Sequence, residues 1–161
     1  MNNLILIGFK SAGKTTLGRW IASQLGRSFI DTDDLFIESP RVSYQKLGEA
    51  EFRDLEKSLL HSLLSLQGCV IATGGGLVCD PDNCLILRQL GTLIHLDTPK
   101  EIIRERIFAS DLPAFLAGSN PAEKFESLYH NRLGIYKEIA HHSIRTEEEL
   151  WEVIHSDPFS V

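Results

Sequence analysis

The sequence predicts an α/β fold in which helices cover both faces of a parallel β-sheet. Short apolar runs of strand length alternate along the chain with longer segments in which apolar residues recur at steps of three and four. The first apolar run also leads directly into a glycine-containing loop and a helix. Parallel strands need long crossover connections, and the helical segments have the length to provide them.

Length and composition favour one domain. The chain has 161 residues, of which 43% are hydrophobic and 24% charged, and we expect residues 1–161 to share one core. The 16 Lys+Arg and 22 Asp+Glu residues give a formal net charge of −6, which argues against a nucleic-acid or anionic-membrane partner. This balance still allows a small anionic ligand held by a few cations.

The sequence shows no pattern of a targeting segment or of a metal cluster. The first apolar run is too short for a signal peptide, and no run approaches the roughly 18 apolar residues of a membrane span. A cytoplasmic protein is therefore expected. Cys69, Cys79 and Cys84 lack the paired spacing of a zinc site and predict no disulfide framework.

The first half of the chain is expected to contain three strands and two helices. Strands are predicted over residues 4–7, 28–31 and 69–73, and helices over 15–25 and about 43–66. Gly26 is placed to end the first helix, and Gly48 to interrupt the second.

The second half continues the alternation of helices and strands. Its expected elements are a helix over 80–91, a strand over 92–97, a helix beginning at 98–101, a helix from 120 to about 140, a strand over 142–145 and a helix from 146 to about 155. Thr98 and Asn120 each precede a proline and an acidic residue, which predicts a helix cap at both positions. Residues 108–119 lie between two helices, contain Pro113 and are predicted to form a mobile lid.

Residues 8–15 read G-F-K-S-A-G-K-T and fit the phosphate-loop pattern G-x-x-x-x-G-K-[ST]. The pattern lies between a predicted strand and a predicted helix, which is the context that it requires. Lys14 is expected to neutralise the β- and γ-phosphates of a nucleotide, and the Thr15 hydroxyl to ligate Mg²⁺. The predicted nucleotide contacts in this region are Gly8, Ser11, Ala12, Gly13, Lys14, Thr15 and Thr16.

A phosphate loop does not identify the group that accepts the phosphate, and four other features bear on it. Asp31 and Asp33 end the second strand, so both carboxylates should reach the crevice beside the loop, one toward a metal and one toward a substrate hydroxyl. The glycines at 74–76 end the third strand and allow a ligand to approach the backbone. Taken singly, the carboxylates and the glycines also fit ordinary turns, and Arg53 and Arg132 fit surface charges.

Together these features resemble the shikimate kinases: a phosphate loop, D-T-D at 31–33, E-F-R at 51–53, G-G-G at 74–76, a lid and a late arginine. The similarity covers nearly the whole chain, from Leu4 to about Ile154. It implies a three-layer α/β/α fold with a five-stranded parallel sheet, a P-loop NTPase of the nucleoside-monophosphate-kinase type. It also implies transfer of the γ-phosphoryl group of ATP to the 3-hydroxyl of shikimate, with Mg²⁺ as cofactor.

Within that fold, the resemblance implies a substrate-binding helical segment at about 32–66 and a lid at about 108–119. It assigns shikimate binding to Asp33, Arg53, Gly75, Gly76 and Arg132. The two arginines would meet the carboxylate of shikimate, which a planar guanidinium fits better than an ammonium does. Lys14 and Asp33 would be catalytic, and Asp31 would support Mg²⁺ beside Thr15. We expect a monomer.

The lid departs from the family pattern. Where the family usually has Arg-Pro-Leu, this chain reads Leu112-Pro113-Ala114, so the arginine that reaches toward the transferred phosphoryl group is missing. Arg104 and Arg106 are the nearest replacements in sequence, and their spacing on a helix lets at most one of them face the phosphates. We assign Arg106 to catalysis and Arg104 to the nucleotide, with the exchange of these roles left open.

Two other functions are compatible with parts of the pattern. Another small-molecule kinase, such as a gluconate kinase, would share the fold and the phosphate loop, but it would not account for Arg53, 75–76 and Arg132 together. A non-catalytic module that binds nucleotide or shikimate would account for Leu112.

Overall fold

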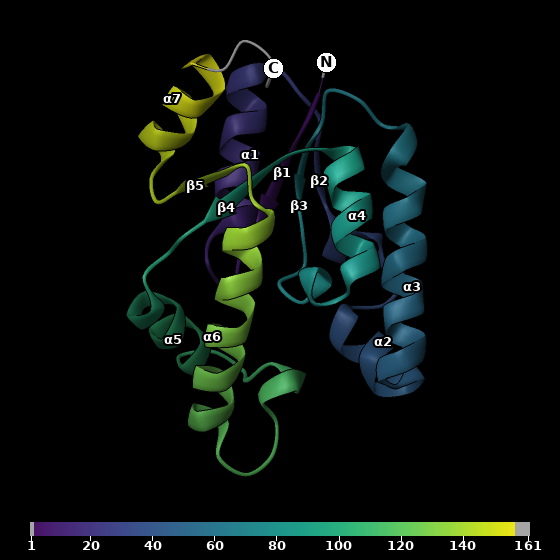
Figure 1. Cartoon of the computed structure of the whole chain (residues 1–161). Helices are drawn as coiled ribbons and strands as arrows, with labels where there is room; N and C mark the ends of the chain where they lie inside the picture. The colour runs from purple at the N-terminus through teal and green to yellow at the C-terminus, as the bar shows by residue number, and fades with distance from the viewer. Residues whose placement is uncertain (1, 157–161) are drawn as a thin grey trace.

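The computed structural model describes residues 2–156 and contains a five-stranded sheet in which every pairing is parallel (Figure 1). The strands are β1 (Asn3–Ile7), β2 (Phe29–Asp31), β3 (Val70–Ala72), β4 (Gly91–Leu96) and β5 (His142–Ile144). Their order in the sheet is β2-β3-β1-β4-β5. The prediction of a five-stranded parallel sheet is therefore confirmed.

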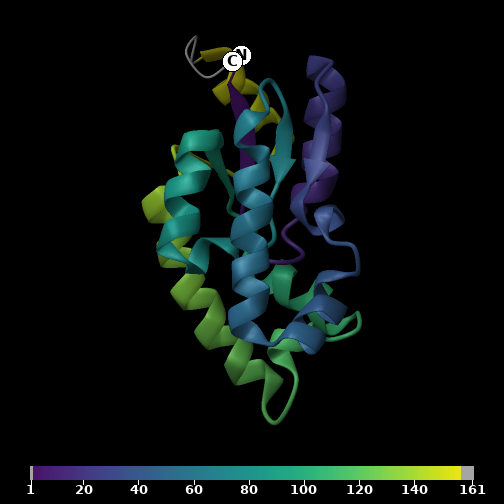
Figure 2. The ribbon, with the colours of Figure 1, turned by 90° about the vertical axis from the view of Figure 1, so that its right-hand side faces the viewer.

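Helices cover both faces of this sheet. They are α1 (Lys14–Leu25), α2 (Pro40–Leu47), α3 (Glu49–Ser62), α4 (Pro81–Leu90), α5 (Lys100–Phe108), α6 (Pro121–Ile139) and α7 (Glu147–Ser156). Figure 2 shows α1 on one side of the sheet and α4 and α6 on the other. The indole rings of Trp20 and Trp151 lie 6.3 Å apart and join α7 to α1. Within residues 2–156, none of the helices has both the length and the apolarity needed to cross a membrane.

Most predicted helix ends are confirmed. Gly26 takes a left-handed conformation after α1, and Gly48 separates α2 from α3. The Asp80 side chain caps α4 by accepting from the Asp82 N–H, and the Thr146 hydroxyl accepts from the Glu149 N–H at the start of α7.

The predicted cap at Thr98 is wrong, and the predicted cap at Asn120 is confirmed in its position only. The N-cap of α5 is Pro99, and the Thr98 hydroxyl instead donates to the Ala12 carbonyl at 2.8 Å. Asn120 takes a left-handed conformation, from which its side chain makes no capping bond to α6. At Thr98 a long-range contact has replaced the local one, and that contact fixes the phosphate loop.

The sheet topology determines where the site lies. Strand β1 is buried along its whole length, and β3 and β4 pair with it on either side. Because the strands are parallel, the carboxyl ends of β1, β2 and β3 meet at one edge of the sheet. The phosphate loop, D-T-D and G-G-G each follow one of these ends, so segments separated in sequence become neighbours.

Candidate active site

A cleft of about 970 Å³ lies at the carboxyl edge of the sheet, over the phosphate loop. Residues 10–17 line one side, and Asp31, Asp33 and residues 73–75 line another. Arg106 and residues 145–148 also line the cleft, and Arg145 is paired with Asp97 at 3.0 Å. The cleft lies at the carboxyl edge of the sheet and over a phosphate loop, as a site for a nucleoside triphosphate requires.

Lys14 is held inside the phosphate loop. Its side chain donates to the carbonyls of Gly8 and Phe9, both at 2.8 Å, and the residue is 7% exposed. Burial lowers the pKa of Lys14 from 10.5 to about 8, against the opposite influence of the Asp33 and Asp31 carboxylates. The ammonium is thus partly desolvated and already directed at the place where phosphate oxygens would bind.

Thr15 and Asp31 form a pair of oxygen donors beside the loop. The Thr15 hydroxyl donates to Asp31 Oδ2 at 2.7 Å, and Asp31 Oδ1 accepts from the Asp33 N–H at 3.0 Å. A hydroxyl and a carboxylate are donors that Mg²⁺ prefers, and both line the cleft. The residues present therefore fit the cofactor that the sequence implied.

A second cavity, of about 260 Å³, adjoins the cleft and is lined by side chains from distant parts of the chain. We call it the acceptor pocket. Its lining residues are Lys10, Asp33, Pro40, Arg41, Tyr44, Phe52, Arg53, Glu56, Gly74, Gly75, Gly76, Asp111, Pro113, Ala114, Phe115 and Arg132. Helices α2, α3 and α6, the three glycines and the lid all contribute.

Two guanidinium groups converge over Gly76. A Cβ at that position would lie 3.3 Å from Arg53 Nη1 and 3.5 Å from Arg132 Nη2. Arg132 is 6% exposed, and among the described residues its Nε has no hydrogen-bond partner. Its guanidinium lies over the rings of Phe9 and Phe115, 5.4 and 5.0 Å from their centroids. Two convergent cations in a half-apolar pocket suit a small ligand with a carboxylate.

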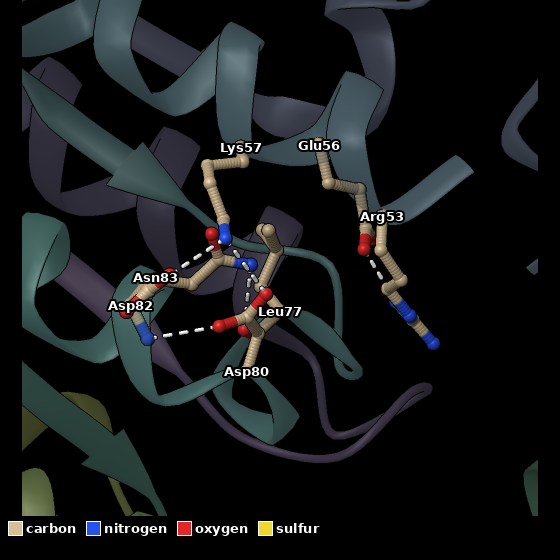
Figure 3. A network of polar contacts seen from close by, with 7 residues as sticks. All are labelled: Arg53, Glu56, Lys57, Leu77, Asp80, Asp82 and Asn83. Atoms are coloured by element: carbon tan, nitrogen blue, oxygen red, sulfur yellow. Dashed lines mark hydrogen bonds and ion pairs between the residues drawn. The ribbon is translucent and has the colours of Figure 1, made fainter. Parts of the chain in front are cut away.

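Helix α3 is joined to the start of α4 by polar contacts that the sequence did not reveal (Figure 3). Glu56 forms an ion pair with Arg53, while the neighbouring Lys57 points the other way and contacts Asp80 at 3.3 Å and Asp82 at 2.8 Å. Burial raises the pKa of Glu56, and the Arg53 cation opposes that shift. The Glu56 ion pair therefore orients Arg53 within α3, and the Lys57 contacts hold α3 against the start of α4.

Tyr136 contacts the glycine loop, residues 74–76. Its hydroxyl donates to the Gly75 carbonyl at 2.5 Å, and the residue is 2% exposed. Gly75 in turn lies against the phosphate loop, because a Cβ there would be only 2.8 Å from the backbone nitrogen of Lys10. Glycine at this position lets the two loops touch, which makes the cleft and the acceptor pocket adjacent.

Asp33 lies between the two cavities and lines both. A Cβ on Gly74 would lie 2.9 Å from Asp33 Oδ1, so the carboxylate rests against the glycine loop. Burial and the Asp31 carboxylate raise the pKa of Asp33, and Lys10 and Lys14 oppose that shift. A carboxylate with a raised pKa at this junction can accept a proton from a bound hydroxyl.

The two candidate lid cations separate in the structure. Arg106 lines the nucleotide cleft and donates to the carbonyls of Ser11 at 3.1 Å and Ala12 at 3.5 Å. Arg104 lies over the Phe108 ring and lines a separate hollow with residues of α6. Residues two positions apart on a helix differ in direction by about 200°, so the structure does not bring Arg104 to the cleft beside Arg106, and its assignment to the nucleotide stays a prediction.

The lid covers the acceptor pocket. Asp111 and residues 113–115 line that pocket, and the Phe115 ring meets the Phe9 ring edge-on at 6.3 Å. Leu116 is fully buried, and Leu112 packs against the core. At the position where the family pattern has a cation, this chain therefore has an apolar side chain that contributes to packing.

A family model described as shikimate kinase matches residues 10–156. The chain belongs to the shikimate kinase family. A shikimate kinase of Acinetobacter baumannii (strain AYE) is 35% identical over 150 residues, which cover 91% of this chain and 83% of the relative. One of Psychrobacter cryohalolentis is 38% identical over 86% of this chain and 77% of the relative. The structure of shikimate kinase from Acinetobacter baumannii in complex with shikimate matches with a TM-score of 0.90 and 32% identity, covering 98% of this chain and 95% of that one.

Proposed function

We propose that this shikimate kinase family member transfers the γ-phosphoryl group of ATP to the 3-hydroxyl of shikimate, giving shikimate 3-phosphate and ADP. One observation carries the proposal: a phosphate-loop cleft and a pocket with two convergent guanidinium groups adjoin, and Asp33 lines both. A relative 32% identical to this chain has been solved with shikimate bound. The substrate is thus a small carboxylate with a hydroxyl directed at the cleft.

The nucleotide is held by the phosphate loop. The backbone N–H groups of the loop and the N-terminus of α1 face the phosphates, and Lys14 moves its ammonium from two loop carbonyls to phosphate oxygens. Thr15 and Asp31 would hold Mg²⁺, which when bound neutralises phosphate charge. The sequence led us to assign Arg106 to catalysis, and we now propose that it binds the nucleotide, since its guanidinium lies on the nucleotide side of the loop.

The acceptor is held by its carboxylate and activated at its hydroxyl. Arg53 and Arg132 bind the carboxylate above Gly76, which orients the ring of shikimate in the pocket. Asp33 accepts the proton of the 3-hydroxyl as the oxygen forms its bond to the γ-phosphorus. The bond between that phosphorus and the β–γ bridging oxygen breaks, and ADP leaves with the electron pair.

The chain is further proposed to act as a cytoplasmic monomer made of one domain, residues 1–161. The support is that residues of this one chain line both cavities. Size-exclusion chromatography with light scattering tests the monomer, and a dimer that is required for activity would contradict it.

The activity is tested by ADP formation from ATP and Mg²⁺ with shikimate, gluconate and nucleoside monophosphates offered separately. Of these acceptors, only shikimate is expected to support turnover. EDTA should abolish that turnover, and added Mg²⁺ should restore it. Turnover with gluconate would identify a different small-molecule kinase. Calorimetric binding of shikimate and nucleotide without turnover would identify a non-catalytic module.

A further inference from the structure

The cation missing from the lid has a counterpart in the phosphate loop. Among the described residues, four line both the nucleotide cleft and the acceptor pocket: Lys10, Asp33, Gly74 and Gly75. Lys10 is the cation in this set. The γ-phosphoryl group must pass from one cavity to the other, so a residue that lines both borders its path.

The side chain of Lys10 is available for this role. Lys10 is exposed, and within residues 2–156 its ammonium makes no hydrogen bond or ion pair. It is close enough to Asp33 to oppose the rise in the pKa of that carboxylate. The backbone of Lys10 is fixed by its contact with Gly75, while the four-carbon side chain stays free to follow a moving charge.

Four other cations near the site do not line both cavities. Arg106 donates to two phosphate-loop carbonyls and lines the nucleotide cleft but not the acceptor pocket. Arg53 is paired with Glu56, and Arg132 is buried between aromatic rings. Arg41 lines the acceptor pocket but not the cleft. Lys10 therefore has a position that none of these four cations shares.

We propose that Lys10 is a catalytic residue that binds the equatorial oxygens of the γ-phosphoryl group during its transfer, in place of a lid arginine. This inference rests on the proposed function. Lys10 donates hydrogen bonds to the transferred group, while the bonds made and broken are those of the transfer itself. Its contact is strongest when the phosphoryl group lies between the two pockets, so it lowers the barrier more than it strengthens ground-state binding.

The decisive variant is Lys10→Met, which keeps an unbranched side chain and removes the charge. Its kcat under saturating ATP, Mg²⁺ and shikimate is expected to fall by about 100-fold or more, as for loss of one preorganised donor to a developing charge. Calorimetric dissociation constants of ADP and of shikimate should stay within about threefold of the parent. Lys10→Arg, which keeps the charge, should retain at least about a third of kcat. The matched control is Lys137→Met, an exposed lysine of α6 that lines neither cavity and should behave as the parent does.

A second measurement reports on the transferred group directly. ADP with aluminium fluoride and shikimate mimics the planar phosphoryl group, and its affinity should fall in Lys10→Met by a factor close to the loss in kcat. Circular dichroism and thermal melting verify that each variant is folded.

Three results would overturn the inference. They are a Lys10→Met kcat within threefold of the parent, equal losses in Lys10→Met and Lys10→Arg, or a loss confined to ADP affinity. A parent without shikimate-dependent turnover would instead overturn the proposed function, and this inference with it. An active parent beside an equally active Lys10→Met variant overturns the inference alone.

Discussion

The nucleotide cleft and the acceptor pocket touch each other but are built in opposite ways. One continuous segment, residues 10–17, forms much of the cleft, and its backbone provides the main contacts for phosphate. The acceptor pocket is formed by residues of the phosphate loop, three helices, the glycine loop and the lid, from Lys10 to Arg132. Binding through the backbone tolerates variation of the side chains, whereas the acceptor pocket depends on each contributing residue.

This difference explains where each site is sensitive. In the cleft, Lys14 is the buried cation at the phosphates, and its loss should affect chemistry with little effect on the fold. In the acceptor pocket, we propose that binding of the substrate carboxylate is divided between Arg53 and Arg132, so the loss of either should weaken binding only in part. Asp33, which lines both cavities, should affect mainly the chemical step.

The largest effect is expected for Lys14→Ala. Turnover should fall by at least about 1,000-fold, because the variant loses the buried cation that stabilises phosphate charge. Shikimate binding should stay within about twofold of the parent, since the acceptor pocket is formed by other residues. Steady-state kinetics and calorimetry with shikimate measure the two quantities, and circular dichroism verifies the fold. Near-normal turnover of the folded variant would remove the phosphate-loop assignment.

Asp33→Asn is expected to have the next largest effect. Its kcat should fall by about 100-fold or more, because the amide can accept a hydrogen bond but cannot take up the proton of the acceptor hydroxyl. Dissociation constants of ADP and shikimate should change by less than about threefold. If kcat is unaltered, Asp33 is an ordinary turn residue and the two cavities do not share a catalytic group.

The two cavities also differed in how well the sequence predicted them. The phosphate loop and D-T-D are local patterns at strand ends, and the parallel sheet brings them together as predicted. Arg53 and Arg132 are unremarkable in sequence, and the family resemblance drew attention to them. The Tyr136 contact to Gly75 had no local signal, because packing selects its partner, whereas Arg53 and Glu56 have the three-residue spacing of an ion pair on a helix.

The wrong and missed predictions have the same cause, which is packing between segments that are distant in the sequence. Thr98 has the sequence of a helix cap, yet its hydroxyl contacts a loop 86 residues away. Lys10 occupies a variable position of the phosphate-loop pattern, so only the adjacency of the two cavities draws attention to it. Arg104 and Arg106 could not be told apart until the direction of α5 was known.

A charge-conserving change tests the acceptor pocket by itself. Arg53→Lys and Arg132→Lys should each raise the KM for shikimate by about 10- to 150-fold, equivalent to about 1.5–3 kcal/mol for a lost charge-assisted contact. The KM for ATP should change much less. Arg88→Lys, on the exposed face of α4 outside both cavities, is the matched control. Equal effects on both substrates would count against the assignment, as would normal turnover of a neutral shikimate amide by the parent.

The smallest expected effect is a difference between the two cavities in how their dissociation constants depend on pH. Burial lowers the pKa of Lys14 to about 8 in the free protein, and bound phosphates favour its charged form. Above pH 8 the free protein therefore holds a neutral Lys14 that must take up a proton when nucleotide binds. The dissociation constant of ADP, measured in EDTA, should rise by about tenfold from pH 7 to pH 9, since each pH unit above the pKa removes about nine tenths of the binding-competent form.

The acceptor pocket should not respond over the same range. Against the effect of burial, the Glu56 carboxylate raises the pKa of Arg53, and the shikimate carboxylate is ionised throughout, so the dissociation constant of shikimate should be flat within about twofold. In Lys14→Met, nucleotide binding should be weaker at every pH, and its rise between pH 7 and pH 9 should disappear. A rise that persists in Lys14→Met would assign the titration to another group. A matching rise for shikimate would show that the two cavities respond to pH as one site.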